Sequence, residues 1–325
     1  MNARSIRTAI IPAAGLDTRL MPASLSTPKA MFPIAQADGR VRPVLHILLR
    51  EAIAAGIERV VLVTPPGGDA TFRRYFSDHR RDRRVGSVAS AQADLAELAA
   101  LAGRIVYVTQ PKPQGFGHAV WCAAEAAAEE PVLVMLGDHL YLGEDGAPPP
   151  AAQVIGAFAA HGAASVVGVA VTAADQLHLH GTVGGDPVNG ADGVYEVRRI
   201  IEKPDPNTAA AELVSPGVAP GYYLTHFGLY AFSSDIFQHL DALVRQPRRP
   251  KGEVQLTTAQ QRLLAAGGRT LALRVRGRRL DMGNPLGLAR TQEAMVRSGG
   301  GLSDGAVGDE HTLARRGFRG GGPVS

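Results

Sequence analysis

The chain has 325 residues, 45% of them hydrophobic and 20% charged, an ordinary globular composition that supports one large domain or two small ones. Its single cysteine, Cys122, excludes an internal disulfide framework and a cysteine cluster for zinc. The net charge of +4 is spread along the chain and aromatic residues make up only 5%, so we predict no nucleic-acid partner. No apolar run reaches membrane-spanning length and the first residues lack a signal-peptide cleavage pattern, so we expect a cytoplasmic protein with no membrane partner.

The first predicted element is a short buried strand over residues 9–12, which ends in a small-residue turn at Ala14 and Gly15. A strand that ends in a tight turn presents backbone N–H groups that attract phosphate. Two cations follow: Arg19 offers a planar fork for phosphate oxygens, and Lys29 offers a point charge. The stretch indicates a polyphosphate cradle, although an ordinary strand and turn with two surface cations has the same spacing.

Residues 41–109 are predicted to continue in the β-α-β order that is typical of a parallel sheet. We expect a helix over 41–56, a buried strand over 59–64, an alanine-rich helix near 89–102 and a further strand over 105–109. This order predicts the α/β class.

The strand that ends at Thr109 is followed by a proline-stiffened loop and a glycine turn, which contain Gln110 and Gly115. Ligands in open α/β sheets bind at such strand ends. The primary amide of Gln110 can pair with O4 and N3–H of a pyrimidine, and equally with O6 and N1–H of guanine. This residue therefore indicates a nucleotide base and leaves its identity open.

A third strand end carries a carboxylate. Asp138 follows the buried strand predicted over 131–136 and comes directly after Gly137. In proteins Mg²⁺ takes one or two carboxylates and completes its shell with phosphates and water. Asp138 is thus a candidate magnesium ligand, with a turn former or helix cap as the alternative.

The second half of the chain is predicted to alternate strands and helices, with a flexible loop over 205–221 and a flexible tail over 298–325. The expected elements are a helix over 154–161, strands over 164–171, 194–201 and 222–232, a helix to 266, a strand over 269–276 and a helix over 286–297. Glu202 and Lys203 follow the second of these strands. A carboxylate beside an ammonium suits a ligand with hydroxyls and a phosphate, and a surface ion pair of small energy is the alternative.

Six segments resemble, in order, the motifs of the sugar-1-phosphate nucleotidylyltransferase family, and the resemblance covers about residues 7–297. The opening stretch is similar to the family pattern G-x-G-T-R-x-x-P-x(4–5)-P-K, with matches at Gly15, Thr18, Arg19, Pro22, Pro28 and Lys29. Asp17 stands where the family normally has glycine. An anionic side chain beside a triphosphate costs energy unless it faces away or binds metal.

The later segments carry the same resemblance. The loop from Gln110 is similar to Q-x(4)-G-[LFT]-[AG]-x-[AS], and residues 117–120 are closest to the glucose-1-phosphate uridylyltransferase branch. The remaining matches are Gly181 in a Y-G-V motif that has His180 in place of tyrosine, Glu202 and Lys203 in E-K-P, Gly228 in the strand beneath the sugar, 252–257 in G-[DE]-x-[QE]-[LI]-T, and 279–285 in W/C-x-D-x-G-[NT].

The resemblance implies a role for each candidate residue. These roles are the triphosphate loop for Ala14 and Gly15, charge stabilisation of the triphosphate for Arg19 and Lys29, base binding for Gln110 and Gly115, sugar binding for Gly181, Glu202 and Gly228, orientation of the attacking phosphate for Lys203, and Mg²⁺ ligation for Asp138 and Asp281.

The resemblance also implies a Rossmann-like α/β nucleotidyltransferase fold with a mixed, mainly parallel central sheet flanked by helices. We expect one catalytic domain over 1–297, with a nucleotide lobe over about 7–145 and a sugar-phosphate lobe over about 146–297. A homo-oligomer, either a dimer or a tetramer, is expected by the same resemblance.

The implied reaction joins a nucleoside triphosphate and a sugar 1-phosphate to give a nucleotide sugar and pyrophosphate, and UTP with glucose 1-phosphate is the best match. Alternatives are transfer from TTP or GTP, and a non-glucose sugar or a cyclitol phosphate as acceptor. The departures at Asp17, His180 and 225–227 motivate the unusual acceptor. A catalytically inactive regulator that binds nucleotide sugars is a third possibility, supported by Asp17 alone.

Overall fold

The computed structural model of the chain describes residues 5–77, 89–128, 130–246 and 252–298. Residues 299–325 of the predicted tail lie outside this part of the chain. Among the described helices, none is both long and apolar enough to cross a bilayer.

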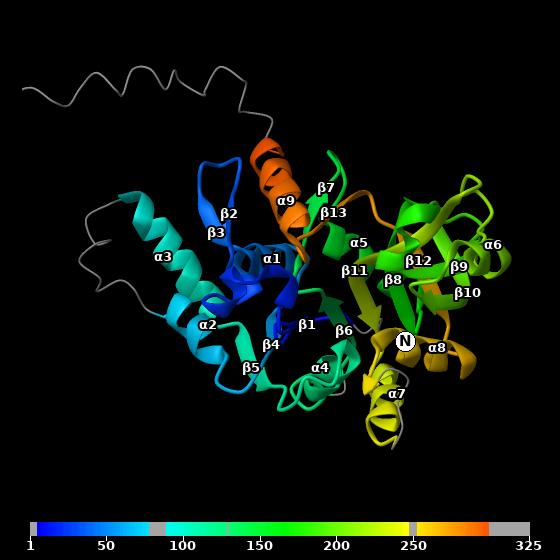
Figure 1. The fold of residues 1–325 in the computed structure, drawn as a ribbon, viewed down its shortest axis with the longest axis horizontal. Helices are drawn as coiled ribbons and strands as arrows, with labels where there is room; N and C mark the ends of the chain where they lie inside the picture. Colours follow the sequence, from blue (N-terminus) through cyan, green and yellow to red (C-terminus); the bar gives the residue numbers. More distant parts are fainter. Residues whose placement is uncertain (1–4, 78–88, 129, 247–251, 299–325) are drawn as a thin grey trace, which may run out of the picture.

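A nine-stranded mixed sheet runs through the molecule (Figure 1). Its strands lie in the order β5 (Ile105–Thr109), β4 (Arg59–Thr64), β1 (Thr8–Pro12), β6 (Val132–Met135), β11 (Tyr222–Phe232), β8 (Ser165–Ala173), β12 (Thr270–Arg274), β10 (Val194–Glu202) and β9 (Gly181–Pro187). β1 is parallel to β4 and β6, and β4 is parallel to β5. The predicted α/β class and the mixed sheet are confirmed.

The prediction of a mainly parallel sheet is wrong for the second half of the chain. β11 is antiparallel to β6, β8 and β9, and β10 is antiparallel to β9 and β12. β8 and β12 are the parallel pair in the described part of this half. β9 and β10 follow each other through a short turn, and strands joined in that way run antiparallel.

The second half of the sheet also closes on itself. β9 pairs with β11 at Leu224 with Val183 and at Thr225 with Thr182. These pairs close β11, β8, β12, β10 and β9 into a five-stranded ring, on the right-hand side of Figure 1. Closure satisfies strand edges that would otherwise be free to pair with another chain. Sequence periodicity identifies each strand but does not say which two edges meet.

Helices flank the sheet, and two small two-stranded sheets lie outside it. The helices are α1 (Val44–Ala54), α2 (Asp69–Tyr75), α3 (Ala89–Ala102), α4 (Phe116–Cys122), α5 (Pro150–His161), α6 (Pro206–Glu212), α7 (Asp235–Val244), α8 (Leu256–Ala265) and α9 (Pro285–Arg297). The small sheets pair β2 (Pro33–Ala35) with β3 (Val41–Pro43), and β7 (His139–Gly143) with β13 (Gly277–Asp281).

Two predicted segments differ from the structure. The helix expected over 41–56 begins later, because its first residues form β3. The segment 205–221, expected as a loop, contains α6. Asp205 caps that helix, with its side chain accepting from the backbone amides of the second and third helical residues, and a proline follows it at the first helical position.

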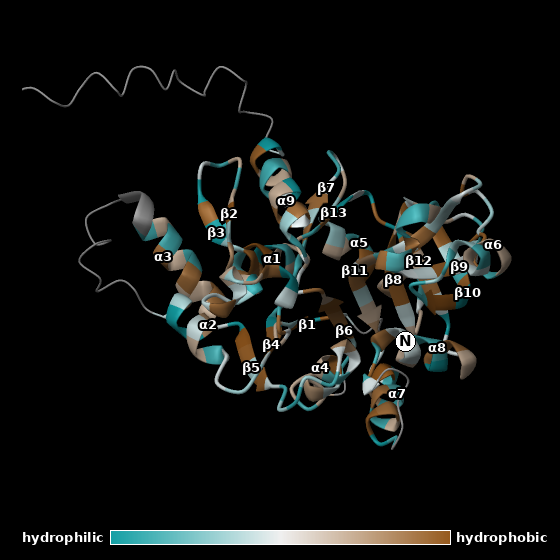
Figure 2. Ribbon diagram, in the orientation of Figure 1, coloured by the Kyte–Doolittle hydropathy of each residue, from teal (hydrophilic) through white to brown (hydrophobic). Residues whose placement is uncertain are grey.

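The core lies on both faces of the sheet. Along β1, Ala9 and Ile11 belong to the cluster that includes α1 and α5, whereas Ile10 belongs to the cluster on the other face with α4, α7 and α8. The alternation follows from the two-residue period of a strand. Figure 2 shows the apolar strands between helices of mixed hydropathy. Burial on both faces fixes the strand ends in space, and the site is built from those ends.

Candidate active site

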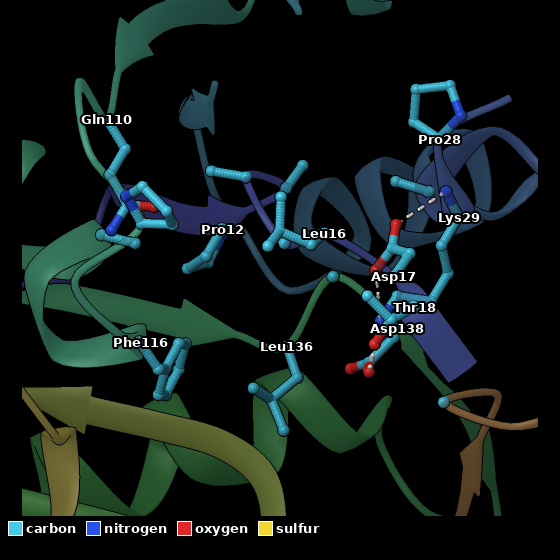
Figure 3. A pocket seen from close by; sticks show the side chains of 18 of the residues that line it. Pro12, Leu16, Asp17, Thr18, Pro28, Lys29, Gln110, Phe116, Leu136 and Asp138 are labelled. Atoms are coloured by element: carbon cyan, nitrogen blue, oxygen red, sulfur yellow. Dashed lines mark hydrogen bonds and ion pairs between the residues drawn. The ribbon is translucent and has the colours of Figure 1, made fainter. Parts of the chain in front are cut away.

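A cavity of about 550 Å³ opens at the carboxyl ends of β1, β5 and β6 (Figure 3). Three loops leave these strand ends and bring distant segments together, as expected for parallel strands of an α/β sheet. The predicted residues that line the cavity are Ala14, Gly15, Arg19, Lys29, Gln110, Gly115 and Asp138.

The loop after β1 presents free backbone amides to the cavity. The amide of Ala13 still donates to the carbonyl of Val63 at 2.7 Å, but the next amides, from Ala14 to Leu16, make no hydrogen bond within the described part of the chain. A Cβ on Gly137 would lie only 2.3 Å from the carbonyl oxygen of Pro12, so glycine is required where the loops after β1 and β6 meet. Unpaired amides in a turn suit a phosphate group.

Lys29 reaches into this loop and is held by two carboxylates. Its Nζ lies 2.9 Å from Oδ1 of Asp17 and 2.9 Å from Oδ2 of Asp138. Burial lowers the pKa of Lys29, but the two carboxylates outweigh burial and leave this pKa raised. The side chain is therefore a partly desolvated ammonium that lines the cavity, where it can bind phosphate oxygens.

Asp138 is a carboxylate that lines the cavity. Its Oδ1 lies 2.9 Å from Nδ1 of His139, while Oδ2 accepts from Lys29. Burial raises the pKa of Asp138, yet His139 and Lys29 together hold it well below its ordinary value. The carboxylate is ionised across the physiological range.

Asp281, predicted as the partner of Asp138, lies close to it. β13 pairs with β7 so that Asp281 is opposite His139, and ligand atoms of Asp138, His139 and Asp281 all lie within 4.8 Å of one another. A Cβ on Gly283 would be 2.9 Å from Asp281 Oδ1, 3.4 Å from Asp138 Oδ2 and 2.9 Å from Nη2 of Arg19. Two carboxylates that converge in this way fit a divalent ion such as Mg²⁺.

The loop after β5 is tightly built around Gln110. The amide nitrogen of Gln110 donates to the carbonyl of Gly115 at 3.2 Å and lies 3.0 Å from Nδ1 of His118. Gly115 has φ +103°, and a Cβ there would lie 2.8 Å from the carbonyl oxygen of Val254. His118 thus contacts the loop, and Gln110 lines the cavity with its amide orientation fixed.

The predicted sugar-binding residues form a second group, in the five-stranded ring. Gly181 is opposite Glu202 in the β9–β10 pair, and Glu202 Oε2 accepts from the hydroxyl of Thr257 at 2.5 Å. A Cβ on Gly181 would lie 2.6 Å from Nδ1 of His226 and 3.1 Å from Glu202 Oε2. Any larger residue than glycine would clash with this group.

Gly228 and Lys203 lie outside these two groups. Gly228, at φ +92° in an irregular part of β11, accepts a hydrogen bond from the Tyr141 hydroxyl at 2.8 Å and so supports β7. Lys203 has φ +50° and an exposed side chain, and its backbone amide donates to the carbonyl of His180 at 3.2 Å. The structure therefore places its ammonium at the surface of the ring.

Asp17 lines the cavity, although the sequence analysis assigned it no role in the site. Its Oδ2 accepts from the backbone amide of Lys29 at 3.1 Å, in addition to the ion pair with the Lys29 ammonium. Asp17 has φ +49°, a left-handed conformation that glycine adopts freely and aspartate tolerates better than most residues. The glycine-to-aspartate departure was the available signal, but the sequence does not show that the carboxylate turns back onto Lys29. His139 was also missed, although it is adjacent to Asp138.

Together these groups suit displacement at phosphorus. The cavity combines free amides, a partly desolvated ammonium, the exposed Arg19 and the carboxylate of Asp138, and Asp281 lies next to Asp138 without lining the cavity. Such groups position phosphates and neutralise their charge, which is what transfer of a phosphoryl or nucleotidyl group requires.

Known proteins of similar sequence carry out this kind of transfer. A model of the nucleotidyl transferase family matches residues 8–297. The UTP–glucose-1-phosphate uridylyltransferase of Bacillus subtilis is 31% identical over 291 residues, covering 89% of this chain and 90% of that protein. The UTP–glucose-1-phosphate uridylyltransferase 2 of Staphylococcus saprophyticus is 33% identical over 294 residues, covering 89% of this chain and 91% of that protein.

Solved structures agree with the sequence relatives. A structure of UDP-glucose pyrophosphorylase complexed with UDP-glucose superposes with a TM-score of 0.72 at 25% identity, covering 89% of this chain and 98% of that one. The UTP-bound UGPase from Acinetobacter baumannii superposes with a TM-score of 0.68 at 28% identity, covering 89% of this chain and 92% of that one. With relatives above 30% identity over most of its length and a family match from β1 to α9, the chain belongs to the nucleotidyl transferase family.

Proposed function

We propose that the protein is a UTP–glucose-1-phosphate uridylyltransferase, which converts UTP and glucose 1-phosphate to UDP-glucose and pyrophosphate. The relatives named above support both substrates. The observation that carries the proposal is the convergence of Lys29, Asp138 and Asp281 on a loop of free amides. A cation, a pair of carboxylates and a phosphate cradle are the parts that nucleotidyl transfer needs.

In this reaction an oxygen of the glucose 1-phosphate attacks the α-phosphorus of UTP in line. The bond from that phosphorus to the bridging oxygen of the β-phosphate breaks, and its electron pair leaves with pyrophosphate. Ala14, Gly15 and Arg19 hold the triphosphate, and Lys29 compensates the charge that develops on pyrophosphate. The acceptor phosphate is itself the nucleophile, so the protein positions reactants and forms no covalent intermediate.

Asp138 and Asp281 hold Mg²⁺ in this proposal. When bound, the ion neutralises the negative charge of the phosphates that must approach each other. His139 fixes the carboxylate of Asp138 through its contact at 2.9 Å, so that one oxygen keeps its orientation.

We assign the uracil base to Gln110 and Gly115, and the glucose ring to Gly181, Glu202 and Gly228. The nucleotide then lies mainly in the lobe of residues 7–145, and the sugar phosphate mainly in the lobe of 146–297. Lys203 is exposed in the structure, and we propose that its side chain turns towards the acceptor when glucose 1-phosphate binds.

A panel of UTP, TTP and GTP against several sugar and cyclitol 1-phosphates, with Mg²⁺-dependent pyrophosphate release as the readout, tests this proposal. Turnover is expected to be fastest with UTP and glucose 1-phosphate. A faster pair would replace the substrate assignment and support the alternative acceptors. Nucleotide binding without turnover on any pair would instead identify a regulator.

Replacing Asp17 by glycine is expected to lower KM for UTP by roughly threefold to tenfold, because removal of one partly screened charge near the triphosphate is worth about 1 kcal/mol. The variant also releases Lys29 from one of its two carboxylates. Steady-state kinetics at fixed Mg²⁺ measure the effect.

Asp17→Asn is the matched control for this prediction. Asparagine also tolerates a positive φ but carries no charge. A lower KM in both variants assigns the effect to charge, and a lower KM in the glycine variant alone assigns it to the backbone. An increase in KM in both would contradict the prediction and show that the Asp17 carboxylate helps to bind UTP.

A further inference from the structure

Arg279 is a half-buried cation with no carboxylate in direct contact, although Asp281 attracts it from the same strand. It lies at the centre of β13, where Nη1 donates to the carbonyl oxygen of His226 and Nη2 donates to Nε2 of His180 at 2.9 Å. Across the described residues, no carboxylate oxygen lies within 4.0 Å of its guanidinium. Burial, with a smaller contribution from Arg279, lowers the pKa of His180 to about 3. The imidazole is therefore neutral at physiological pH and serves as an acceptor.

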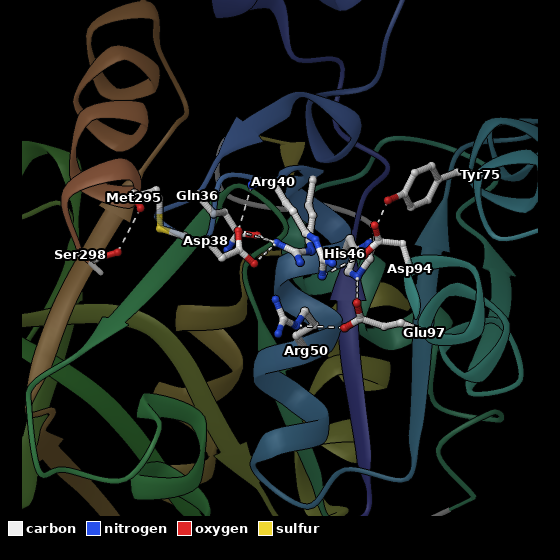
Figure 4. A network of polar contacts seen from close by, with 11 residues as sticks. Gln36, Asp38, Arg40, His46, Arg50, Tyr75, Asp94, Glu97, Met295 and Ser298 are labelled. Atoms are coloured by element: carbon white, nitrogen blue, oxygen red, sulfur yellow. Dashed lines mark hydrogen bonds and ion pairs between the residues drawn. The ribbon is translucent and has the colours of Figure 1, made fainter. Parts of the chain in front are cut away.

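Arg42 is a buried arginine with a structural role, and its contacts can be compared with those of Arg279. Its guanidinium lies 2.9 Å from a carboxylate oxygen of Asp38 and 2.6 Å from the amide oxygen of Gln36, two residues of the network in Figure 4. Arg279 has only neutral partners, and a guanidinium has five N–H donors, so three of its donors remain. Asp281 attracts this guanidinium without contacting it. Because a partly desolvated charge with unused donors costs free energy, the arrangement suits an anion in direct contact, which the described part of the chain does not supply.

The position of Arg279 identifies that anion. Arg279 and Asp281 are two residues apart on one strand and therefore lie on the same face of it, which places Arg279 beside the carboxylate cluster. Its other neighbour, His226, contacts the space around Gly181 and Glu202. Arg279 thus lies between the residues assigned to the metal and those assigned to the sugar ring. In a sugar 1-phosphate, the group between the ring and the reacting phosphorus is the phosphate.

We propose that Arg279 binds the phosphate of glucose 1-phosphate, with its guanidinium oriented by the ring of His180 and the carbonyl of His226. This inference rests on the proposed function. Two donors of a planar fork can engage two phosphate oxygens at once and leave the third directed at the α-phosphorus. We expect the residue to act on the acceptor, because Arg279 does not line the cavity that contains the triphosphate loop.

The sequence supports a coupled role for Arg279 and His180. Arg279 stands where the family pattern has Trp or Cys, and His180 stands where it has tyrosine. These two departures, 99 positions apart, contact each other at 2.9 Å. Lys203, to which the resemblance assigns the acceptor phosphate, is exposed, and its backbone amide bonds to the same His180. Arg279 therefore supplies a cation held in place by β11 and His180, whereas Lys203 supplies an exposed one.

Arg279→Gln tests the proposal in the full-length enzyme. KM for glucose 1-phosphate is expected to increase by roughly tenfold to a hundredfold, the range for loss of a charge-assisted hydrogen bond, while KM for UTP changes less than about twofold. Calorimetric titration with UTP and Mg²⁺ in the absence of acceptor should give the wild-type dissociation constant. Arg279→Lys retains the positive charge but loses the planar fork. Its KM for glucose 1-phosphate should lie between those of the wild type and Arg279→Gln.

Arg278→Gln is the matched control, because Arg278 is the exposed neighbour on the opposite face of β13. It should leave both KM values unchanged. Thermal unfolding of each variant separates a folding defect from a binding defect. If Arg279→Gln does not fold, the comparison is made with Arg279→Lys, for which a selective increase in KM for glucose 1-phosphate is still expected.

Two results would overturn the proposal. One is an unchanged KM for glucose 1-phosphate in a folded Arg279→Gln variant. The other is an equal loss of affinity for both substrates together with a lower unfolding temperature, which would give Arg279 a purely structural role. If the wild-type enzyme itself does not turn over UTP with glucose 1-phosphate, the proposed function fails, so the two failures are distinguishable.

Discussion

Replacement of Asp138 by asparagine is expected to lower kcat by more than ~10²-fold, because a neutral amide oxygen is a much weaker Mg²⁺ ligand than a carboxylate and no longer keeps the ion in place in the transition state. The substitution preserves the shape of the side chain. Its oxygen can still accept from Lys29, so the loop should stay close to its present position. Pyrophosphate release at saturating substrates measures kcat. In a Mg²⁺ titration, the variant should reach its half-maximal rate at a higher Mg²⁺ concentration than the wild type.

Asp145→Asn is a suitable control for Asp138→Asn, because Asp145 is exposed in the turn after β7 and lies outside the cavity. It should retain wild-type kinetics. An unfolding temperature of Asp138→Asn close to that of the wild type would assign the loss to chemistry. Near-wild-type kcat in Asp138→Asn would remove Asp138 from the metal site and, with it, the proposed role of Asp281.

Removal of the Lys29 ammonium, in Lys29→Ala, is expected to lower kcat by a similar factor of more than ~10². The variant loses the cation that neutralises the negative charge developing on pyrophosphate. It also leaves Asp17 and Asp138 facing each other without a positive charge between them. Lys29→Arg should restore little activity, because a planar fork does not fit the position of a compact ammonium that contacts two carboxylates. The double variant Asp17→Asn/Lys29→Ala should bind UTP more tightly than Lys29→Ala, since one of the uncompensated charges is absent.

Lys112→Ala is the control for the lysine variants. Lys112 is one of only four lysines in the chain, is exposed, and lies in the loop after β5 without lining the cavity. Its removal should change kcat and both KM values by less than about twofold, as expected for an exposed charge. A loss of activity in Lys112→Ala as large as that in Lys29→Ala would show that overall charge, and not the position of Lys29, controls the rate.

Much of the cavity could be predicted from the sequence. Strands ending at Pro12, Thr109 and Met135 are visible as apolar runs, and the loop after each run contributes residues that line the cavity. The reason is physical: neighbouring parallel strands end at the same edge of a sheet, so the loops that leave them meet at that edge. The sequence therefore determined that Gln110 and Asp138 would be close to the loop after β1.

The tertiary structure alone decided the contacts between segments that no local pattern links. The closure of the ring at Leu224 with Val183 depends on the twist and register of the whole sheet. The network in Figure 4 is another case, in which His46 of α1 lies 2.8 Å from the Tyr75 hydroxyl and 3.4 Å from Glu97 of α3. Periodicity specifies which face of a helix or strand is apolar, but not which polar group it will meet.

Asp17 and Arg279 show the same division within the site. The sequence identified Asp17 as a departure from glycine, and only the fold shows that its carboxylate binds Lys29 at both the backbone amide and the ammonium. Arg279 departs from the Trp or Cys of the family pattern, and only the fold shows that its guanidinium contacts His180 and His226 and no carboxylate. Local pattern thus determined where the chain would place phosphate-binding groups, while the pairing of distant strands decided which charges those groups share.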